Sequence, residues 1–215
     1  MSYKNLSRFQ KYCNNKTIAI VGNSSSIFNK SYGKDIDSHD VVIRFNWVIE
    51  KNLHKWSANL GTKFNVYVYA IKSPGRFRNM AVNKLFSNKS FIIRIRHDDE
   101  HYIKSQQIKL SDKIKNKLLY YNKQEFDDSI SVEDFKESRD ASAGAMTLQF
   151  ILDCINFKHI SLYGFDFFKS AEDTPRLSNE FKSFFYNHHN KKDEEKFFIS
   201  KINEYKGTGK LKFYT

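Results

Sequence analysis

A short apolar run that stops at a glycine-led polar turn constrains the fold of this chain more than any other feature. Residues 17–21 (TIAIV) are rich in β-branched side chains, and the polar run GNSSS follows at once at 22–26. An apolar run too short for a buried helix and bounded by turn residues is typical of a strand in a parallel sheet. Ligands of open α/β sheets bind outside the carboxyl ends of strands. We therefore expect Gly22, Asn23 and Ser24 to lie at a nucleotide site.

Other apolar runs extend this prediction to a whole sheet. The second run, residues 41–43, leads to Asn46. We expect this strand to lie beside the strand at 17–21, so that Asn23 and Asn46 follow the ends of adjacent strands. Further strands are predicted at 64–70, 91–95, 159–163 and 211–214. The order strand, helix, strand with short joins fits a parallel βαβ arrangement. The fold class is therefore α/β, with a Rossmann-like, mostly parallel sheet flanked by helices.

The length of 215 residues suits one domain, which we place over residues 1–215. Within it, residues 1–16 form a polar lead-in with a short helix at 6–12. Residues 103–138 are rich in Lys, Asn and Asp, and we expect surface helices or a lid there.

A second group of small residues precedes an apolar helix in the middle of the chain. Ser142, Ala143 and Gly144 lead into residues 145–155, whose apolar side chains repeat at helical spacing. Free amide hydrogens and the dipole at the start of a helix favour an anion. The alternative is a plain serine cap with small residues for tight packing. The next strand, 159–163, runs directly into Gly164 and Phe165.

The last block places two histidines before an amphipathic helix. His188 and His189 follow Tyr186, and the acidic run 193–195 is a favourable first turn for the helix. The helix field disfavours a protonated histidine, whereas the neighbouring carboxylates favour it. Ordinary polar loop residues are the alternative for this pair.

Two short patterns raise the question of a metal. Asp35 and Asp37 have the D-x-D spacing with which many nucleotide-sugar transferases hold a divalent cation, against capping or hydrogen bonding in a connector. His97 and His101 would share a helical face but lack the H-E-x-x-H order. We favour the alternatives without a metal in both places.

Net charge and cysteine content limit the expected binding partners and the cellular compartment. The formal charge of +12 suits an anionic partner, although Lys spread along the chain also serves solubility, and no basic-aromatic nucleic-acid module is present. Two cysteines are too few for a disulfide framework, and neither a signal peptide nor a membrane-spanning stretch is seen. We expect a cytoplasmic protein.

The three polar blocks together resemble the sialyltransferases of glycosyltransferase family 29. Their large sialylmotif is matched by residues 20–24, 32–33, 36–40, 44–46 and 61–63. The small sialylmotif is matched by residues 142–144 with 162–165, and the H-x4-E spacing of the very small motif by His189 and Glu194. Family 42 sialyltransferases, which share the CMP-sialic acid donor, are also similar.

The chain departs from the family pattern in several places. Ala141 stands where the family has proline before the small-motif serine, and the family's motif III has no clear counterpart, with Tyr186 or His188 as the candidate substitute. Cys13 and Cys154 do not match the family disulfide. The membrane anchor and stem are also missing, as expected of a compact bacterial-type relative.

The resemblance implies an inverting transferase that moves sialic acid, or a related keto-acid sugar such as Kdo, from CMP to a glycan hydroxyl. His189 would be the general base, with His188 as the alternative, and Glu194 would orient its loop or cap its helix. The substrates would be bound by residues from all three blocks: Gly22, Asn23, Ser24, Asn46, Ser142, Ala143, Gly144, Tyr163, Gly164, Phe165 and Tyr186. A monophosphate donor has no diphosphate to bridge, so no metal or other cofactor is expected.

Other function classes fit less well. A dinucleotide oxidoreductase would have G-x-G-x-x-G after the first strand, which residues 22–26 do not supply. A non-catalytic nucleic-acid or membrane-surface binder would explain the charge but leave the Ser142 and His189 blocks without a role. Expected partners are therefore the donor, a lipo-oligosaccharide or capsule acceptor, and peripherally an anionic inner membrane face, with no nucleic acid. The sequence predicts no oligomeric state.

Overall fold

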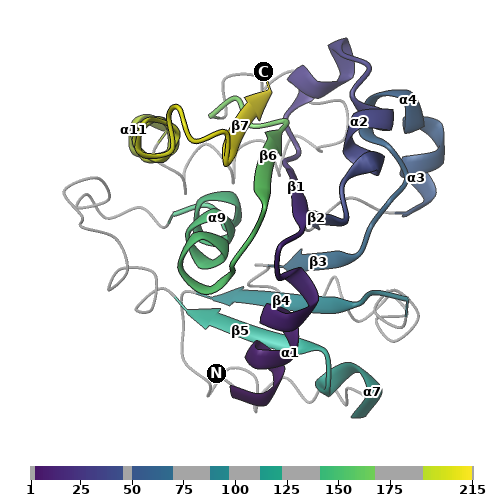
Figure 1. The fold of residues 1–215 in the computed structure, drawn as a ribbon. Coiled ribbons are helices and arrows are strands. Elements are labelled where there is room, and N and C mark those ends of the chain that lie inside the picture. Colours follow the sequence, from purple (N-terminus) through teal and green to yellow (C-terminus); the bar gives the residue numbers. More distant parts are fainter. Residues whose placement is uncertain are drawn as a thin grey trace.

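A computed structural model of the chain describes residues 3–45, 50–69, 88–96, 112–122, 141–167 and 191–214. Its centre is one sheet of seven strands in the order β5-β4-β3-β2-β1-β6-β7, and every neighbouring pair is parallel (Figure 1). The strands are β1 (Thr17–Val21), β2 (Val41–Phe45), β3 (Val66–Tyr69), β4 (Phe91–Arg96), β5 (Leu118–Asn122), β6 (His159–Tyr163) and β7 (Leu211–Tyr214).

The strand order changes direction at β1. From this strand, β2 to β5 follow on one side, whereas β6 and β7 lie on the other. Such a switch point is where open α/β sheets leave room for a ligand outside the carboxyl ends of the strands. The turn after β1 therefore lies at the switch point of the sheet.

Helices cover both faces of the sheet (Figure 1). Ile18 and Ile20 of β1 pack into a cluster with residues of α1, α9 and α11, whereas Ala19 and Val21 pack with residues of η1, α2 and α4. The helices are α1 (Tyr3–Cys13), the 3-10 helix η1 (Ser25–Asn29), α2 (Gly33–Ser38), α3 (Glu50–Lys55), α4 (Ser57–Leu60), α7 (Asp112–Lys115), α9 (Ala143–Cys154) and α11 (Lys191–Glu204).

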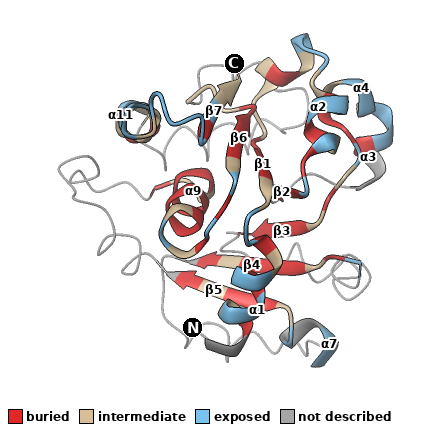
Figure 2. Cartoon of the chain, in the orientation of Figure 1, coloured by how far each residue is buried: buried red, intermediate tan, exposed pale blue. Residues whose placement is uncertain are grey.

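The central strands are buried on both faces, which explains their continuous apolar sequences (Figure 2). The predicted α/β fold with a parallel sheet is confirmed. No helix in the described part of the chain is long and apolar enough to cross a membrane.

Two elements of the described chain, β5 and α2, were not predicted from the sequence. Within residues 103–138, where we expected surface helices or a lid, the described part contains the short helix α7 and the edge strand β5. Leu118, Leu119 and Tyr121 of β5 are buried, but the run is short and flanked by polar residues, which hid the strand. The connector after η1 contains helix α2, which buries only Gly33 and Ile36 and therefore has almost no apolar pattern.

Candidate functional site

The turn after β1 is tied to the turn after β6 at the carboxyl edge of the sheet. The Gly22 amide donates a hydrogen bond to the Tyr163 carbonyl oxygen at 2.7 Å, and the Ser24 amide donates to the Gly164 carbonyl oxygen at 3.1 Å. A Cβ atom on Gly22 would lie 2.3 Å from that Gly164 oxygen. Only glycine therefore lets the two backbones approach this closely, which explains why the first turn begins with it.

Asn23 and Ser24 stabilise the turn with their side chains. The Asn23 side-chain amide donates a weak hydrogen bond of 3.4 Å to the Phe45 carbonyl oxygen at the end of β2. Ser24 caps η1, since its hydroxyl oxygen accepts a hydrogen bond from the Ser26 amide at 3.1 Å. Both side chains are half-buried at the carboxyl end of β1.

Phe165 connects this turn to the start of helix α9. A Cβ atom on Gly144 would lie 2.5 Å from Cε1 of the Phe165 ring, and one on Gly22 would lie 3.4 Å from its Cδ1. The same ring packs against Phe198 of α11 with 5.0 Å between ring centroids. Phe165 thus brings together the turn after β1 and the helices α9 and α11.

Glu194 of α11 reaches the first residue of the α9 block. The Ser142 amide donates to one Glu194 carboxyl oxygen at 2.5 Å, and the Ser142 hydroxyl donates to the other at 2.9 Å. The Ser142 hydroxyl oxygen also accepts a hydrogen bond from the Ala145 amide at 3.1 Å, so Ser142 is the N-cap of α9. Two segments 52 residues apart therefore meet at one helix start.

Residue Glu194 is only 2 % exposed. Burial raises its pKa from the ordinary value of 4.5 to about 7, although the two hydrogen bonds from Ser142 act in the opposite direction. The group therefore changes charge near neutral pH while it remains at the start of α9.

The sequence matches the profile of glycosyltransferase family 29 (sialyltransferase) over residues 4–206. The chain belongs to glycosyltransferase family 29. It is therefore a CMP-sugar-dependent glycosyltransferase, which excludes the non-catalytic binding protein considered above.

Solved structures agree with this family 29 fold. A mammalian sialyltransferase in complex with Gal-beta-1-3GalNAc-ortho-nitrophenol is 19% identical, with a TM-score of 0.62 over 94% of this chain and 69% of that chain. A second mammalian sialyltransferase structure is 20% identical, with a TM-score of 0.63 over 93% of this chain and 69% of that one. At 19% and 20% identity, these two comparisons show a similar fold and nothing further. No curated protein sequence matches the family 29 chain.

Tyr163 faces away from the α9 side of the family 29 domain. Its ring packs in the cluster with η1, α2 and α4, and its hydroxyl donates to a carboxyl oxygen of Asp35 at 2.5 Å. The ring also stacks on Tyr214, with 4.5 Å between centroids. Burial and the bond to Asp35 raise the pKa of Tyr163. Only the Tyr163 backbone, through its bond from Gly22, lies at the predicted donor edge.

The two carboxylates of the D-x-D pair accept hydrogen bonds from two different parts of the protein. Asp35 accepts the Tyr163 hydroxyl, whereas Asp37 accepts hydrogen bonds from the amides of Thr62 and Lys63, each at 2.8 Å. The hydrogen-bonding alternative is thus what the geometry shows. Among the described residues, no three His, Cys, Asp or Glu side chains gather in a way that suits a metal ion.

Sequence reasoning missed the role of Arg44 in this part of the family 29 domain. The side chain is fully buried and donates to the carbonyl oxygens of Leu60, at 2.5 Å, and Lys63, at 2.9 Å. It thereby holds the turn before β3. An arginine inside an apolar strand is the sequence signal from which such a role can be inferred.

Several predicted residues lie outside the described residues. They are Asn46, Tyr186, His188 and His189, together with His97 and His101 of the possible metal cluster.

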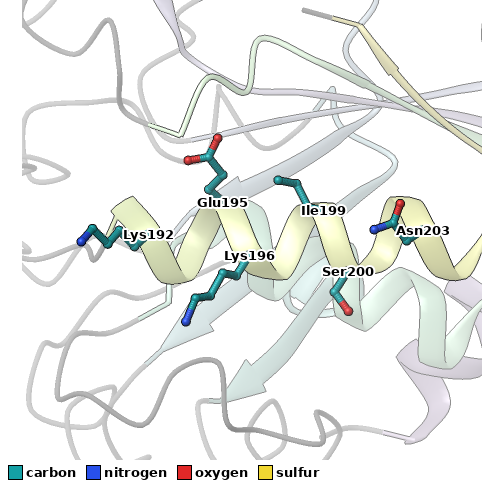
Figure 3. Close-up of a pocket in the computed structure, with 6 residues that line it drawn as sticks. All are labelled: Lys192, Glu195, Lys196, Ile199, Ser200 and Asn203. Carbon is teal, nitrogen blue, oxygen red and sulfur yellow. The ribbon is translucent and has the colours of Figure 1, made fainter.

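The structure also has a groove of about 660 Å³ on the exposed side of α11 (Figure 3). It is lined by Lys192, Glu195, Lys196, Ile199, Ser200 and Asn203. Glu194, Phe197 and Phe198 are on the buried side of the same helix, so this groove is separate from the contact with Ser142.

Proposed function

We propose that the protein transfers sialic acid, or a related keto-acid sugar such as Kdo, from its CMP-activated form to a glycan hydroxyl with inversion. The observation that carries this proposal is the convergence of three sequence blocks at the switch point. The turn after β1, the turn after β6 and the start of α9 meet around Phe165, and Glu194 joins them from α11. We propose that residues 1–215 work as one glycosyltransferase domain.

The donor binds at the carboxyl ends of β1, β2 and β6 in this proposal. Asn23, Ser24 and Asn46 hold the phosphate, ribose or cytosine. The close contact of Gly22 with Gly164 fixes the turn that carries Asn23 and Ser24. The start of α9, from Ser142 to Gly144, meets the phosphate, because amide hydrogens and the helix dipole stabilise negative charge there.

Catalysis requires charge stabilisation and a base. CMP is already a good leaving group, so the start of α9 stabilises the charge that develops as the phosphate departs. His189 removes the proton from the acceptor hydroxyl, which attacks the anomeric carbon from the opposite face, and His188 is the alternative base. Tyr186 contributes to substrate binding in this proposal. The monophosphate donor needs no metal in this scheme.

The first experiment is a thermal-shift screen with CMP, NAD and a short oligonucleotide. We expect stabilisation by CMP alone. Product analysis by mass spectrometry with CMP-sialic acid, CMP-Kdo and a mixed acceptor panel then identifies the sugar. Stabilisation by NAD or the oligonucleotide, without CMP binding, would refute the proposal.

We also propose that the enzyme works in the cytoplasm at the inner membrane face, on a lipo-oligosaccharide or capsule precursor. The charge of +12 and the low cysteine content support this setting. Flotation with anionic liposomes at low salt tests it, since an electrostatic contact is strongest there and is screened by added salt. Absence of binding at low salt would contradict it.

A further inference from the structure

Lysine stands at or near the start of most strands of the sheet. Four strands, β1, β5, β6 and β7, directly follow a lysine, and β4 begins two residues after one: Lys16, Lys117, Lys158, Lys210 and Lys89. Because every neighbouring pair of strands is parallel, these strand starts lie along one edge of the sheet, opposite the edge with the turn after β1. The fold therefore places a row of cations along the amino edge.

Backbone hydrogen bonds hold one end of this row together. The Lys158 amide donates to the Lys16 carbonyl oxygen at 2.9 Å, and the Ile160 amide donates to the Lys210 carbonyl oxygen at 2.7 Å. Lys158 and Lys210 are exposed, as is the whole loop 206–210 that precedes β7, whereas Lys16 is half-buried. Three lysines from segments far apart in the sequence therefore lie on neighbouring strands at this end.

A second group of cations lies at the other end of the row. The Arg8 guanidinium of α1 donates to the carbonyl oxygen of Asn116, the residue before Lys117, at 2.7 Å. Burial lowers the pKa of Lys117, and the neighbouring Lys113 and Arg8 lower it further. Like charges at this end therefore lie close enough to act on one another. We refer to the cations of both ends as the basic edge: Arg8, Lys16, Lys113, Lys117, Lys158, Lys206 and Lys210.

Acidic residues offset only part of this charge in the described part of the chain. Asp40 precedes β2, but its carboxyl group accepts hydrogen bonds from the amide and the hydroxyl of Thr17, each at 2.9 Å. Asp112 and Asp153 also lie near the amino edge, and Glu204 forms an ion pair within α11. Cations therefore remain in excess along this edge.

We propose that the basic edge docks on an anionic lipid surface, with the donor site facing away from the bilayer. This inference rests on the proposed function, whose membrane setting it assigns to one surface of the molecule. Seven strands about 4.8 Å apart make this edge roughly 30 Å long, which is several Debye lengths at physiological salt. One small anion does not contact cations this far apart, whereas lipid head groups meet each of them.

The described part of this edge offers charge without exposed apolar surface. Ile199 is the exposed large hydrophobic residue among those described, and it lines the groove on α11. We therefore expect contact without insertion, which is electrostatic and weakened by salt. Nucleic acid is a poorer fit, because no exposed aromatic side chain for base stacking is found among the described residues of the edge.

This orientation has consequences for both substrates. A strand of five residues such as β1 is about 17 Å long, so the proposed donor site lies at least that far from the lipid. The distance is roughly twice the Debye length at physiological ionic strength, and the anionic CMP-sugar therefore meets little repulsion from lipid charges. A lipid-linked acceptor must extend its reacting hydroxyl a similar distance from the head groups.

Vesicle flotation with a matched pair of triple variants tests the docking surface. The test variant replaces three exposed lysines of the basic edge by glutamine: Lys113→Gln, Lys158→Gln and Lys210→Gln. The control variant replaces three exposed lysines on other elements: Lys34→Gln, Lys55→Gln and Lys196→Gln. Each variant lowers the net charge of +12 by the same three charges, so only the position of the charges differs.

Binding is measured at low salt on phosphatidylcholine vesicles that contain about one third phosphatidylglycerol. Each lysine near an anionic surface strengthens binding by about fivefold, so the test variant should lose ~100-fold and the control variant less than about threefold. Wild-type binding should fall with added salt and should be absent on pure phosphatidylcholine. Equal losses in the two variants would show that net charge alone acts, and would overturn the inference.

Fluorescence quenching tests the orientation. Labels are attached to Lys206→Cys on the basic edge or to Lys34→Cys, each in a Cys154→Ser background so that the half-buried native thiol is not labelled. Lys34 lies near the opposite edge, because the ring of nearby Tyr32 contacts the last residues of β6 and β7. Spin-labelled head groups should quench the label at position 206 more strongly. Stronger quenching at position 34 would overturn the inference.

Further controls separate this inference from the transferase proposal. Both triple variants should keep the melting temperature and the CMP-induced thermal shift of wild type, because the replaced side chains are exposed and lie outside the proposed donor site. Wild-type protein that floats with vesicles but does not bind CMP would refute the transferase proposal alone. Wild-type protein that does not float at low salt would refute the docking surface. Tighter binding to a duplex oligonucleotide than to vesicles, lost in the test variant, would make the edge a nucleic-acid surface and would also overturn the inference.

Discussion

The buried carboxyl group of Glu194 makes the stability of the protein depend on pH in a predictable way. Burial raises its pKa from 4.5 to about 7, so the folded protein binds this proton more tightly than the unfolded chain. The contribution of Glu194 to the free energy of unfolding therefore falls as the pH rises from about 4.5 to about 7 and is constant above that range. Each tenfold change in proton affinity corresponds to about 1.4 kcal/mol, which gives a fall of roughly 3 kcal/mol.

Glu194→Gln removes the titrating group and keeps its shape. We expect the unfolding free energy of wild type, minus that of the variant, to fall by roughly 3 kcal/mol as the pH rises from 4.5 to 7. Urea denaturation at half-unit pH intervals measures it. Glu195→Gln, one residue along the same helix, is the matched control and keeps the wild-type profile because it retains Glu194. A wild-type minus Glu194→Gln difference that stays constant with pH would refute the burial argument.

Further predictions follow from other contacts. His189→Ala should retain CMP binding but lose transfer by ~100-fold or more in a single-turnover assay, and retained turnover would assign the base elsewhere. Gly144→Ala should destabilise the protein by about 1–3 kcal/mol in urea denaturation, because the added methyl group meets the Phe165 ring, and an unchanged midpoint would contradict the close contact. Tyr163→Phe should cost about 1 kcal/mol of stability through the lost bond to Asp35 but leave the transfer rate unchanged. A slower Tyr163→Phe enzyme of normal stability would place that hydroxyl in the donor site.

Local apolar patterns were sufficient to predict most of the sheet. Strands such as Thr17–Val21 and His159–Tyr163 are short, apolar and bounded by turn residues, because they are buried on both faces. Leu118–Asn122 was missed because this edge strand lies between lysine- and asparagine-rich segments that obscured its apolar run. Propensity and periodicity depend only on residues close together in the sequence. They therefore predicted the strands that are short, apolar and buried on both faces.

The contacts of the candidate site were harder to predict than its residues. Ser142 and Glu194 were both singled out, yet nothing in either block indicates that one accepts two hydrogen bonds from the other across 52 residues. Tyr163 sits in a motif with Gly164, but strand alternation directs its side chain to the opposite face. Such pairings depend on how α9 and α11 pack on the sheet, which a single sequence does not specify.

The carboxylates that the sequence suggested for chemistry all accept hydrogen bonds from the protein. Asp35 accepts from Tyr163, Asp37 from the turn at Thr62, and Glu194 from Ser142. A sialic acid donor carries a carboxylate as well as a phosphate, so an uncompensated acidic side chain beside it would weaken binding by repulsion. Amide hydrogens at a helix start avoid this problem, since they are fixed, need no counter-ion and keep their polarity at any pH. At the start of α9 the Glu194 carboxyl group is bonded to Ser142, so this acidic side chain is compensated within the protein.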